Sequence, residues 1–286
     1  MSPRLTQHVA TDEASQFAET VAAIVARHAA PDPWTPGAAT SDANEDLERA
    51  LHEAGWEELG YDATLLPLVA PAAAELGREF ASLVPVDALL GGALKVGSLV
   101  RYPKENVLLI EPVGGELRVW PPGEWSAVPY TDALGVARVE GEPESVAPVD
   151  PGEAETRMAS WVAGSTGYLA GLSQEALRLA LDHAQSRRAF GGPLSALEPV
   201  QQMLADAATL VDGLALLAGD SPGLDALVHA GEAAERAVAI CMQVTGALGF
   251  TTEFPLQRAY RRSRSARAWA DAVAVAWDGG GAEVAT

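Results

Sequence analysis

Arg187-Arg188-Ala189-Phe190-Gly191-Gly192-Pro193-Leu194 separates two long segments in which apolar residues recur every three or four positions. The first segment runs from Gly164 to Arg187, and the second begins at Val200. This spacing predicts two amphipathic helices, and the glycines and proline between them end the first one. Because two long helices joined by a short turn pack antiparallel, the stretch predicts a helical hairpin.

The turn of this hairpin carries a pair of side chains with a possible binding role. Arg187 stands about one helical turn before Phe190. A guanidinium forks onto phosphate oxygens, and an aromatic face stacks on a flat ring, so the pair suits a ligand that has both groups. A purely structural role is the alternative, with Arg187 complementing the helix dipole and Phe190 filling the turn.

Composition and charge narrow the class of protein. The chain has 286 residues, 48% of them hydrophobic, which is enough for a substantial core divided into two or three subdomains. Its net charge of -20 disfavours nucleic acid and anionic membrane surfaces as partners. The only cysteine, Cys241, suits a reducing compartment, and no apolar run approaches the ~18 residues of a membrane helix. We therefore expect a soluble, cytoplasmic protein.

The chain reads as three regions, with mainly helical structure. Residues 1–100 form a helical domain, residues 101–150 a small β-domain with a linker, and residues 151–286 an antiparallel four-helix bundle. Helices are expected at 12–28 with Thr11 as the cap, 41–54, 65–80, 86–99, 153–188, 198–217, 224–248 and 255–276. Four strands are expected at 107–110, 117–120, 125–129 and 134–139, the first two forming a hairpin, and 140–150 reads as a linker.

Several familiar kinds of active site are missing from the sequence. A di-metal bundle needs two Glu-x-x-His pairs and further carboxylates, a pattern that the histidines do not provide, so no metal site is expected. Ser165 lacks the first glycine of a nucleophile elbow. The glycines around it, Gly164, Gly167 and Gly171, instead predict close contact between helices.

Two other features remain open to more than one interpretation. The segment 243–253 ends a predicted helix with glycines that permit close approach of a ligand to the backbone, although a simple helix cap is equally consistent. Arg258, Arg261, Arg262, Arg264 and Arg267 form a basic island, which is either a solvated face or a site for an acidic partner or an anionic ligand.

The C-terminal motifs, taken together and in order, resemble those of the acyl-CoA dehydrogenase family. The matching motifs are Arg187-x-x-Phe190-Gly191-x-Pro193-Leu194, Val200-Gln201, Leu204-Ala205-Asp206 and Gln243-x-x-Gly246-x-x-Gly249-Phe250-Thr251-x-Glu253. Weaker likeness at 51–56 and 74–78 extends to the family's N-terminal helical domain. The resemblance spans most of the chain and is strongest from Gly164 to Ala268. It implies a helical domain, a β-domain and a four-helix bundle, assembled as a dimer or a dimer of dimers.

The resemblance also implies a cofactor, FAD, bound across a subunit interface. In the family, the residues matching Arg187 and Phe190 reach the pyrophosphate and adenosine half of a neighbouring subunit's FAD. The residues matching Gln243, Gly246 and Ala247 approach the same half. The resemblance therefore predicts these five residues as cofactor-binding.

The chain departs from the family where the chemistry takes place. Family members use a glutamate to remove the α-proton of an acyl-CoA thioester while a β-hydride passes to the flavin. Ala270 and Trp161 occupy the two positions where members keep that glutamate, and neither accepts a proton. Asp271 is adjacent, but one helical residue rotates a side chain by ~100°.

Further departures affect the flavin and nucleotide contacts. The β-domain at 101–149 lacks the family's flavin-facing and substrate-facing motifs. Ala189, Glu198 and Ala247 replace the usual threonine, glutamine and glycine, and a Glu198 carboxylate repels phosphate. No catalytic residue is therefore predicted.

These patterns lead to one hypothesis and two alternatives. The chain is expected to be the non-catalytic subunit of a hetero-oligomeric acyl-CoA dehydrogenase, such as the heterotetrameric types that act on steroid side-chain thioesters. A catalytic acyl-CoA dehydrogenase-like partner would supply the flavin pocket, the glutamate and the main acyl-CoA site. A flavin-free pseudo-enzyme that stabilises partners is the first alternative. A complete homodimeric enzyme with Asp271 as base is the second.

Overall fold

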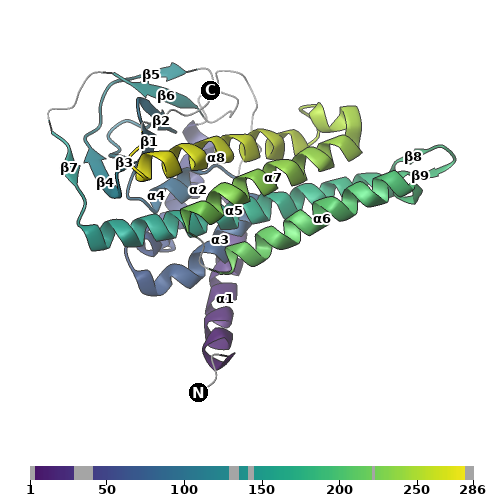
Figure 1. The fold of residues 1–286 in the computed structure, drawn as a ribbon, viewed down its shortest axis with the longest axis horizontal. Helices are drawn as coiled ribbons and strands as arrows, with labels where there is room; N and C mark the ends of the chain where they lie inside the picture. Colours follow the sequence, from purple (N-terminus) through teal and green to yellow (C-terminus); the bar gives the residue numbers. More distant parts are fainter. Residues whose placement is uncertain (1–3, 29–40, 129–134, 141–144, 221–222, 281–286) are drawn as a thin grey trace.

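The computed structural model describes residues 4–28, 41–128, 135–140, 145–220 and 223–280. A sheet occupies one end of the molecule, long helices run from it to the other end, and α1 (Arg4–His28) projects from the side (Figure 1). Buried apolar residues from the N-terminal helices, the inner sheet face and the bundle form one continuous core. The expected mainly helical architecture, with a small sheet and a C-terminal bundle, is confirmed.

The four-helix bundle forms where the sequence predicts it. It consists of α5 (Pro151–Ser186), α6 (Glu198–Ala218), α7 (Leu224–Thr245) and α8 (Leu256–Trp277). Asp150 caps α5, because its carboxylate accepts hydrogen bonds from the backbone N–H groups of Gly152 and Glu153. Each helix ends within three residues of its predicted boundary.

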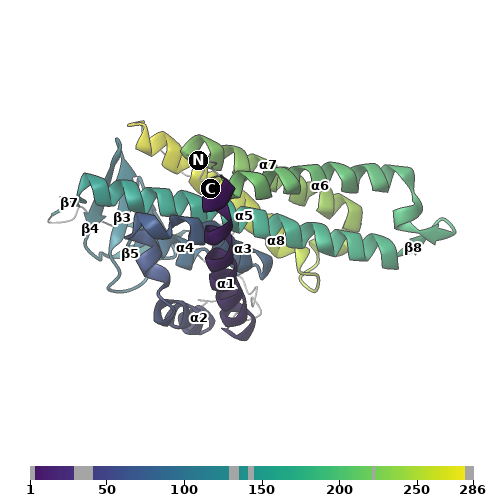
Figure 2. The ribbon, with the colours of Figure 1, turned by 90° about the horizontal axis from the view of Figure 1, so that it is seen from below.

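The N-terminal helices pack on the other side of α5. They are α2 (Ser41–Glu53), α3 (Leu66–Arg78) and the short α4 (Val84–Ala88), with 3-10 turns at Trp56–Gly60 and Ala63–Leu65. Figure 2 shows α2 on the opposite side of α5 from α6 and α7. The prediction that Thr11 caps the first helix is wrong, since α1 already begins at Arg4. No glycine or proline lies between residues 4 and 11 to stop a helix there.

Glycines bring α3 and α5 into backbone contact, as the sequence predicts. A Cβ atom at Gly167 would lie 2.2 Å from the carbonyl oxygen of Ala70, and one at Gly171 would lie 1.9 Å from that of Ala74. In return, a Cβ at Gly77 of α3 would lie 2.1 Å from the Tyr168 carbonyl oxygen. The crossing therefore depends on three positions that have no side chain.

The sheet begins earlier than the sequence predicts. The expected helix over 86–99 is wrong, because only α4 is helical there and β1 (Ala93–Val96) and β2 (Leu99–Arg101) follow it. Gly91 and Gly97 have positive φ values of 92° and 56°, which break the helix and turn the chain between the strands. The sheet thus starts eight residues before the predicted boundary at 101.

Seven strands form the main sheet within the described ranges, in the order β5-β6-β2-β1-β3-β4-β7. The remaining strands are β3 (Leu109–Val113), β4 (Glu116–Trp120), β5 (Trp125–Val128), β6 (Val136–Val139) and β7 (Ala147–Pro148). The predicted sheet of four strands is therefore too small, and the predicted linker over 140–150 contributes β7. Parallel pairing of Ala93 with Leu109 joins β1 to β3.

The predicted hairpin between β3 and β4 is confirmed, and its turn joins the sheet to the bundle. Gly114 and Gly115 have φ values of 60° and 77°, as a two-residue type I′ turn requires. Their N–H groups donate hydrogen bonds to the carbonyl oxygens of Ala276 and Trp277, at 2.9 and 2.7 Å. The turn thereby satisfies backbone acceptors at the C-terminus of α8.

Candidate functional site

The stretch that links α5 to α6 forms a miniature β-hairpin. The strands β8 (Arg188–Ala189) and β9 (Gly192–Pro193) pair, and Phe190 and Gly191 make the turn with φ values of 55° and 87°. The Phe190 side chain is 91% exposed, so it does not fill the turn. A non-glycine residue in this backbone region is uncommon, and here it places an aromatic ring in solvent.

Arg187 is the residue at which α5 ends. Its backbone N–H donates to the His183 carbonyl oxygen, and its side chain is exposed. Its guanidinium makes no hydrogen bond or ion pair with any residue in the described part of the chain. Burial, followed by the positive charge of Arg187, lowers the pKa of His183. Arg187 is therefore a cation available to an external anion.

The second predicted segment follows the end of α7. Gln243 is exposed on the last helical turn, and Gly246 ends the helix with φ 61° and ψ -143°. Gly246 has open space where a Cβ would stand. Ala247 follows it as an exposed residue of the 3-10 turn η4 (Gly246–Phe250). This segment presents backbone and small side chains to solvent, as close approach of a ligand requires.

Both segments lie at the same end of the bundle, remote from the sheet (Figure 1). The His183 ring of α5 meets the Phe254 ring just after η4, with centroids 6.3 Å apart. Phe250 of η4 is 65% exposed, and its ring meets that of Tyr260 with centroids 6.2 Å apart. The structure thus gathers Arg187, Phe190 and the segment around Gln243 on one exposed end.

The substitutions noted in the sequence lie near this end too. Ala189 is half-buried in β8, and Glu198 is exposed as the first residue of α6. An acidic side chain in the first helical turn is favoured by the helix dipole. Glu198 therefore has a structural role as well as the repulsion toward phosphate inferred from the sequence.

The two positions that the sequence resemblance assigns to the family's base are buried. Trp161 and Ala270 are 1% and 2% exposed. The Trp161 indole N–H donates to Asp87 Oδ1 at 3.1 Å, and Arg101 Nε donates to Asp87 Oδ2 at 2.8 Å. A buried ion pair therefore lies beside Trp161, and neither position holds a proton acceptor.

Sequence reasoning missed this ion pair. Asp87 lay in a segment predicted as a longer helix, and Arg101 lay at a predicted domain boundary. The pair joins α4 to β2, and Asp87 of α4 also contacts Trp161 of α5. Arg101 Cζ also lies 5.4 Å from the ring of buried Trp269, one residue before Ala270. A local pattern gives no signal for such a contact.

Asp271 belongs to a network on the α7 side of α8. Its Oδ2 lies 3.6 Å from Arg267 Nε, and Arg267 also pairs with Glu235 at 2.7 Å and with Glu232 at 3.2 Å. Burial raises the pKa of Asp271, while the charge of Arg267 acts in the opposite direction. Part of the basic island therefore meets acidic groups of α7 within the same chain.

Metal and membrane sites receive no support from the described residues. No group of three or more potential metal-ligating His, Cys, Asp or Glu side chains occurs in the described ranges. Within the same ranges, no helix combines the length and apolar character that crossing a bilayer requires.

Comparisons with known proteins relate the C-terminal bundle to one family. Residues 158–220 and 226–276 match the family model described as acyl-CoA dehydrogenase, C-terminal domain. The mitochondrial short-chain specific acyl-CoA dehydrogenase of Sus scrofa is 36% identical over 107 residues, which cover 33% of this chain and 26% of that protein. The chain thus matches about a quarter of the length of this curated relative.

Solved structures extend the likeness to the whole fold. The Tcur3481-Tcur3483 steroid ACAD superposes with a TM-score of 0.71 at 18% identity, over 91% of this chain and 94% of that one. The ChsE4-ChsE5 complex of Mycobacterium tuberculosis gives 0.64 at 16% identity, with the same coverage. The resemblance seen in the sequence is confirmed: the bundle matches the C-terminal domain of acyl-CoA dehydrogenases, and the chain has the acyl-CoA dehydrogenase fold.

Proposed function

We propose that this chain is the non-catalytic subunit of a hetero-oligomeric, FAD-dependent acyl-CoA dehydrogenase. A catalytic acyl-CoA dehydrogenase-like partner carries the base and most of the acyl-CoA site, and FAD is shared between the two chains. The observation that carries the proposal is a contrast. Arg187 and Phe190 stand exposed at one end of the bundle, whereas Trp161 and Ala270 are buried and accept no proton.

The exposed end fits the nucleotide half of FAD. Arg187 supplies a guanidinium for the pyrophosphate, the Phe190 ring offers a face for the adenosine, and the turn at Gly246 and Ala247 lets a ligand approach the backbone beside Gln243. The flavin, when bound, accepts the hydride from the β-carbon of the thioester. The residues of this chain bind and orient; they remove no proton.

The names of two similar structures support a partner and a substrate class. Each is named as a pair of chains, and one is named a steroid ACAD. We extend both properties to this chain as part of the proposal. It has a catalytic partner subunit, and the complex carries out α,β-desaturation of an acyl-CoA thioester, with steroid side-chain thioesters as the substrate class.

The Arg187→Ala variant tests the proposal in the co-expressed complex. A charge-assisted hydrogen bond contributes about 1.5–3 kcal/mol, so its loss weakens FAD binding about ten- to a hundredfold. Flavin content is measured from the visible absorbance of the purified complex, with its mass measured by light scattering. Arg178→Ala, an exposed arginine of α5 paired with Glu175 and Asp182, is the matched control.

The second candidate is a flavin-free pseudo-enzyme that stabilises a partner. The observation that favours it is the pair Glu198 and Ala247, since a carboxylate repels phosphate and a Cβ obstructs close approach to the turn. The Arg187→Ala variant distinguishes the FAD-sharing subunit from the flavin-free pseudo-enzyme. An Arg187→Ala complex that keeps its mass and its flavin supports the pseudo-enzyme.

A complete enzyme with Asp271 as base makes the opposite prediction for the chain alone. The proposal expects the purified chain to oxidise no acyl-CoA, whereas a homodimeric enzyme turns over unaided. Turnover that Asp271→Asn abolishes in the homogeneous chain would establish that third function.

A further inference from the structure

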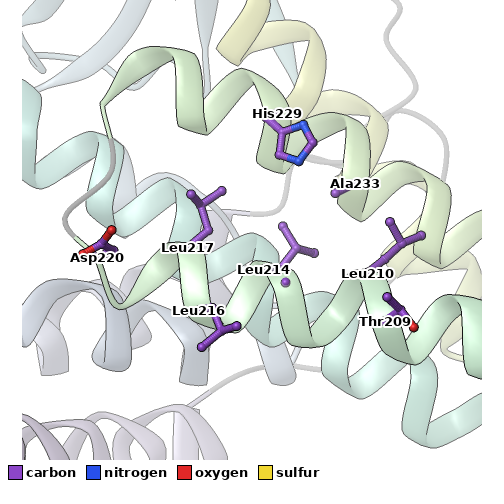
Figure 3. Close-up of a pocket in the computed structure, with 9 residues that line it drawn as sticks. Thr209, Leu210, Leu214, Leu216, Leu217, Asp220, His229 and Ala233 are labelled. Atoms are coloured by element: carbon purple, nitrogen blue, oxygen red, sulfur yellow. The ribbon is translucent and has the colours of Figure 1, made fainter.

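A groove of about 460 Å³ runs between α6 and α7. Figure 3 shows Leu210, Leu214 and Leu217 of α6 pointing toward α7, with His229 and Ala233 on the facing helix. The side chains of the two helices leave the space between them unfilled, and most of its lining is apolar. The groove is therefore apolar and open at the surface.

Leu216 extends this apolar surface outward. Its side chain is 77% exposed, second only to Phe190 among the large hydrophobic residues in the described part of the chain. A single exposed leucine is unremarkable, but one that adjoins an unfilled apolar groove forms a contiguous patch, which is typical of interaction sites.

The patch is separate from the FAD-binding end. Leu216 lies 18 residues along α6 from Glu198, the residue at which the helix begins beside the hairpin. With a rise of 1.5 Å per residue, the two ends lie about 27 Å apart. A contact at Leu216 is therefore physically independent of the contacts made by Arg187 and Phe190.

The acidic residues near the groove indicate what kind of partner surface binds there. The helix α6 carries Glu198, Asp206 and Asp212 but no lysine or arginine, and Asp220 lines the groove. The C-terminal end of α6 adds the negative pole of the helix dipole at the same place. A second copy of this chain is disfavoured, because two proteins with a net charge of -20 repel each other.

We propose that this groove receives an apolar side chain of the catalytic partner subunit, flanked there by lysine or arginine. The identity of the partner rests on the proposed function; the position of the contact and its chemistry come from the groove. Leu216 and the leucines of α6 provide the apolar contact. Asp212 and Asp220 select the basic flank.

The experiment compares Leu216→Arg with wild type in the complex formed by co-expression with the catalytic subunit. Leu216 is exposed, so the substitution leaves the fold intact, and a cation there repels a basic flank. The dissociation constant, measured by titration of labelled subunits, rises about tenfold or more, as loss of one buried leucine contact predicts. Asp212→Asn weakens binding less and reduces its salt dependence. Val275→Arg, at an exposed α8 position, is the control and changes neither.

The outcomes separate this inference from the proposed function. If Leu216→Arg and Asp212→Asn bind as tightly as wild type while Arg187→Ala loses FAD, the groove inference is overturned and the proposed function stands. If Arg187→Ala keeps its flavin while Leu216→Arg weakens the complex, the shared FAD site is overturned and the groove inference stands. A Leu216-dependent dimer of the chain alone identifies a second copy as the occupant and overturns the inference. Absence of any wild-type complex overturns both.

Discussion

The carboxylate of Asp87 is the most consequential buried charge near the closed base positions. It accepts hydrogen bonds from Trp161 and Arg101, and the Asp87 and Arg101 side chains are 3% and 2% exposed. Removing one partner of a buried pair leaves an uncompensated charge, so Asp87→Asn is expected to lower the free energy of unfolding by about 3–5 kcal/mol.

Urea denaturation measures this loss, and a surface pair provides its control. Asp182 is 61% exposed and pairs with Arg178 at 2.6 Å. Asp182→Asn should cost no more than about 1 kcal/mol, because exposed ion pairs are screened by solvent. Equal effects of the two substitutions would contradict a structural role for the buried pair.

The pKa of His183 depends on the charge of Arg187, so it can be used to detect that charge in the absence of any cofactor. Burial is the first cause of its lowered pKa and the Arg187 charge the second. Arg187→Ala should therefore move the His183 pKa toward its ordinary value without reaching it. An NMR titration of the imidazole resonances measures the change, and Arg178→Ala should leave the titration unaltered.

The direction of the pH effect on stability follows from the same shift. The pKa of His183 is lower in the folded state, so neutral His183 contributes stability above the ordinary histidine value of about 6.5. That contribution is lost as pH falls through the lowered value, because the unfolded chain binds the proton more readily. Arg187→Ala should make stability fall less between neutral and acidic pH. An unchanged pH profile and an unchanged titration would show that the Arg187 charge does not reach His183.

At the residue scale, motif spacing identified the exposed end but not the buried pair. Arg187 and Phe190 stand just before Gly191, Gly192 and Pro193, a local signal for a turn that the sequence carries directly. Asp87 and Arg101 come from different elements, and their contact depends on how α4 and β2 pack together in the folded chain. Long-range packing of this kind has no local periodicity.

Among the contacts between elements, the crossing of α3 and α5 leaves the least room for an added side chain. A Cβ at Gly171 would lie 1.9 Å from the Ala74 carbonyl oxygen, and backbone atoms cannot rotate away as a side chain does. Gly171→Ala is expected to destabilise the protein by about 1–3 kcal/mol through overpacking.

Gly213 supplies the matched control on α6. It is exposed, and nothing lies within 4 Å of the position of its Cβ. Gly213→Ala should stabilise the protein by up to about 1 kcal/mol, because alanine has the higher helix propensity. Thermal unfolding of both variants measures these effects: the unfolding temperature should fall for Gly171→Ala and rise for Gly213→Ala. A shift of the same sign in both variants would contradict the close α3–α5 contact.

Helices were predictable where residues near their ends, such as glycine and proline, mark the boundary in the sequence. Glycine and proline follow α5 within seven residues, and apolar spacing marks α6 to α8, so the predicted boundaries lie close to the observed ones. The strands β1 and β2 were mistaken for helix because their apolar run has no clear period and their pairing partners lie in β3 and β6. Such strands are stabilised by neighbours distant in sequence rather than by local preference.

For the whole molecule, the similarity of the fold to known structures was predictable from the sequence, but the function of this particular chain was not. The family model matches only 158–220 and 226–276, yet similar structures cover about nine-tenths of the chain. The fold therefore persists where sequence similarity is weak. What distinguishes this chain lies in individual positions, above all the two that lack a proton acceptor.

Restoring the missing base should not restore activity to the chain alone. Ala270 is 2% exposed beside Trp269, and a glutamate there would have to bury its charge without a partner. Ala270→Glu is expected to cost about 3–5 kcal/mol of stability and to give no turnover, measured with an acyl-CoA and an artificial electron acceptor. Val275→Glu, at an exposed position on α8, should keep wild-type stability. Turnover by the homogeneous Ala270→Glu chain would mean that it binds flavin and thioester unaided, and the proposed dependence on a catalytic partner would then be wrong.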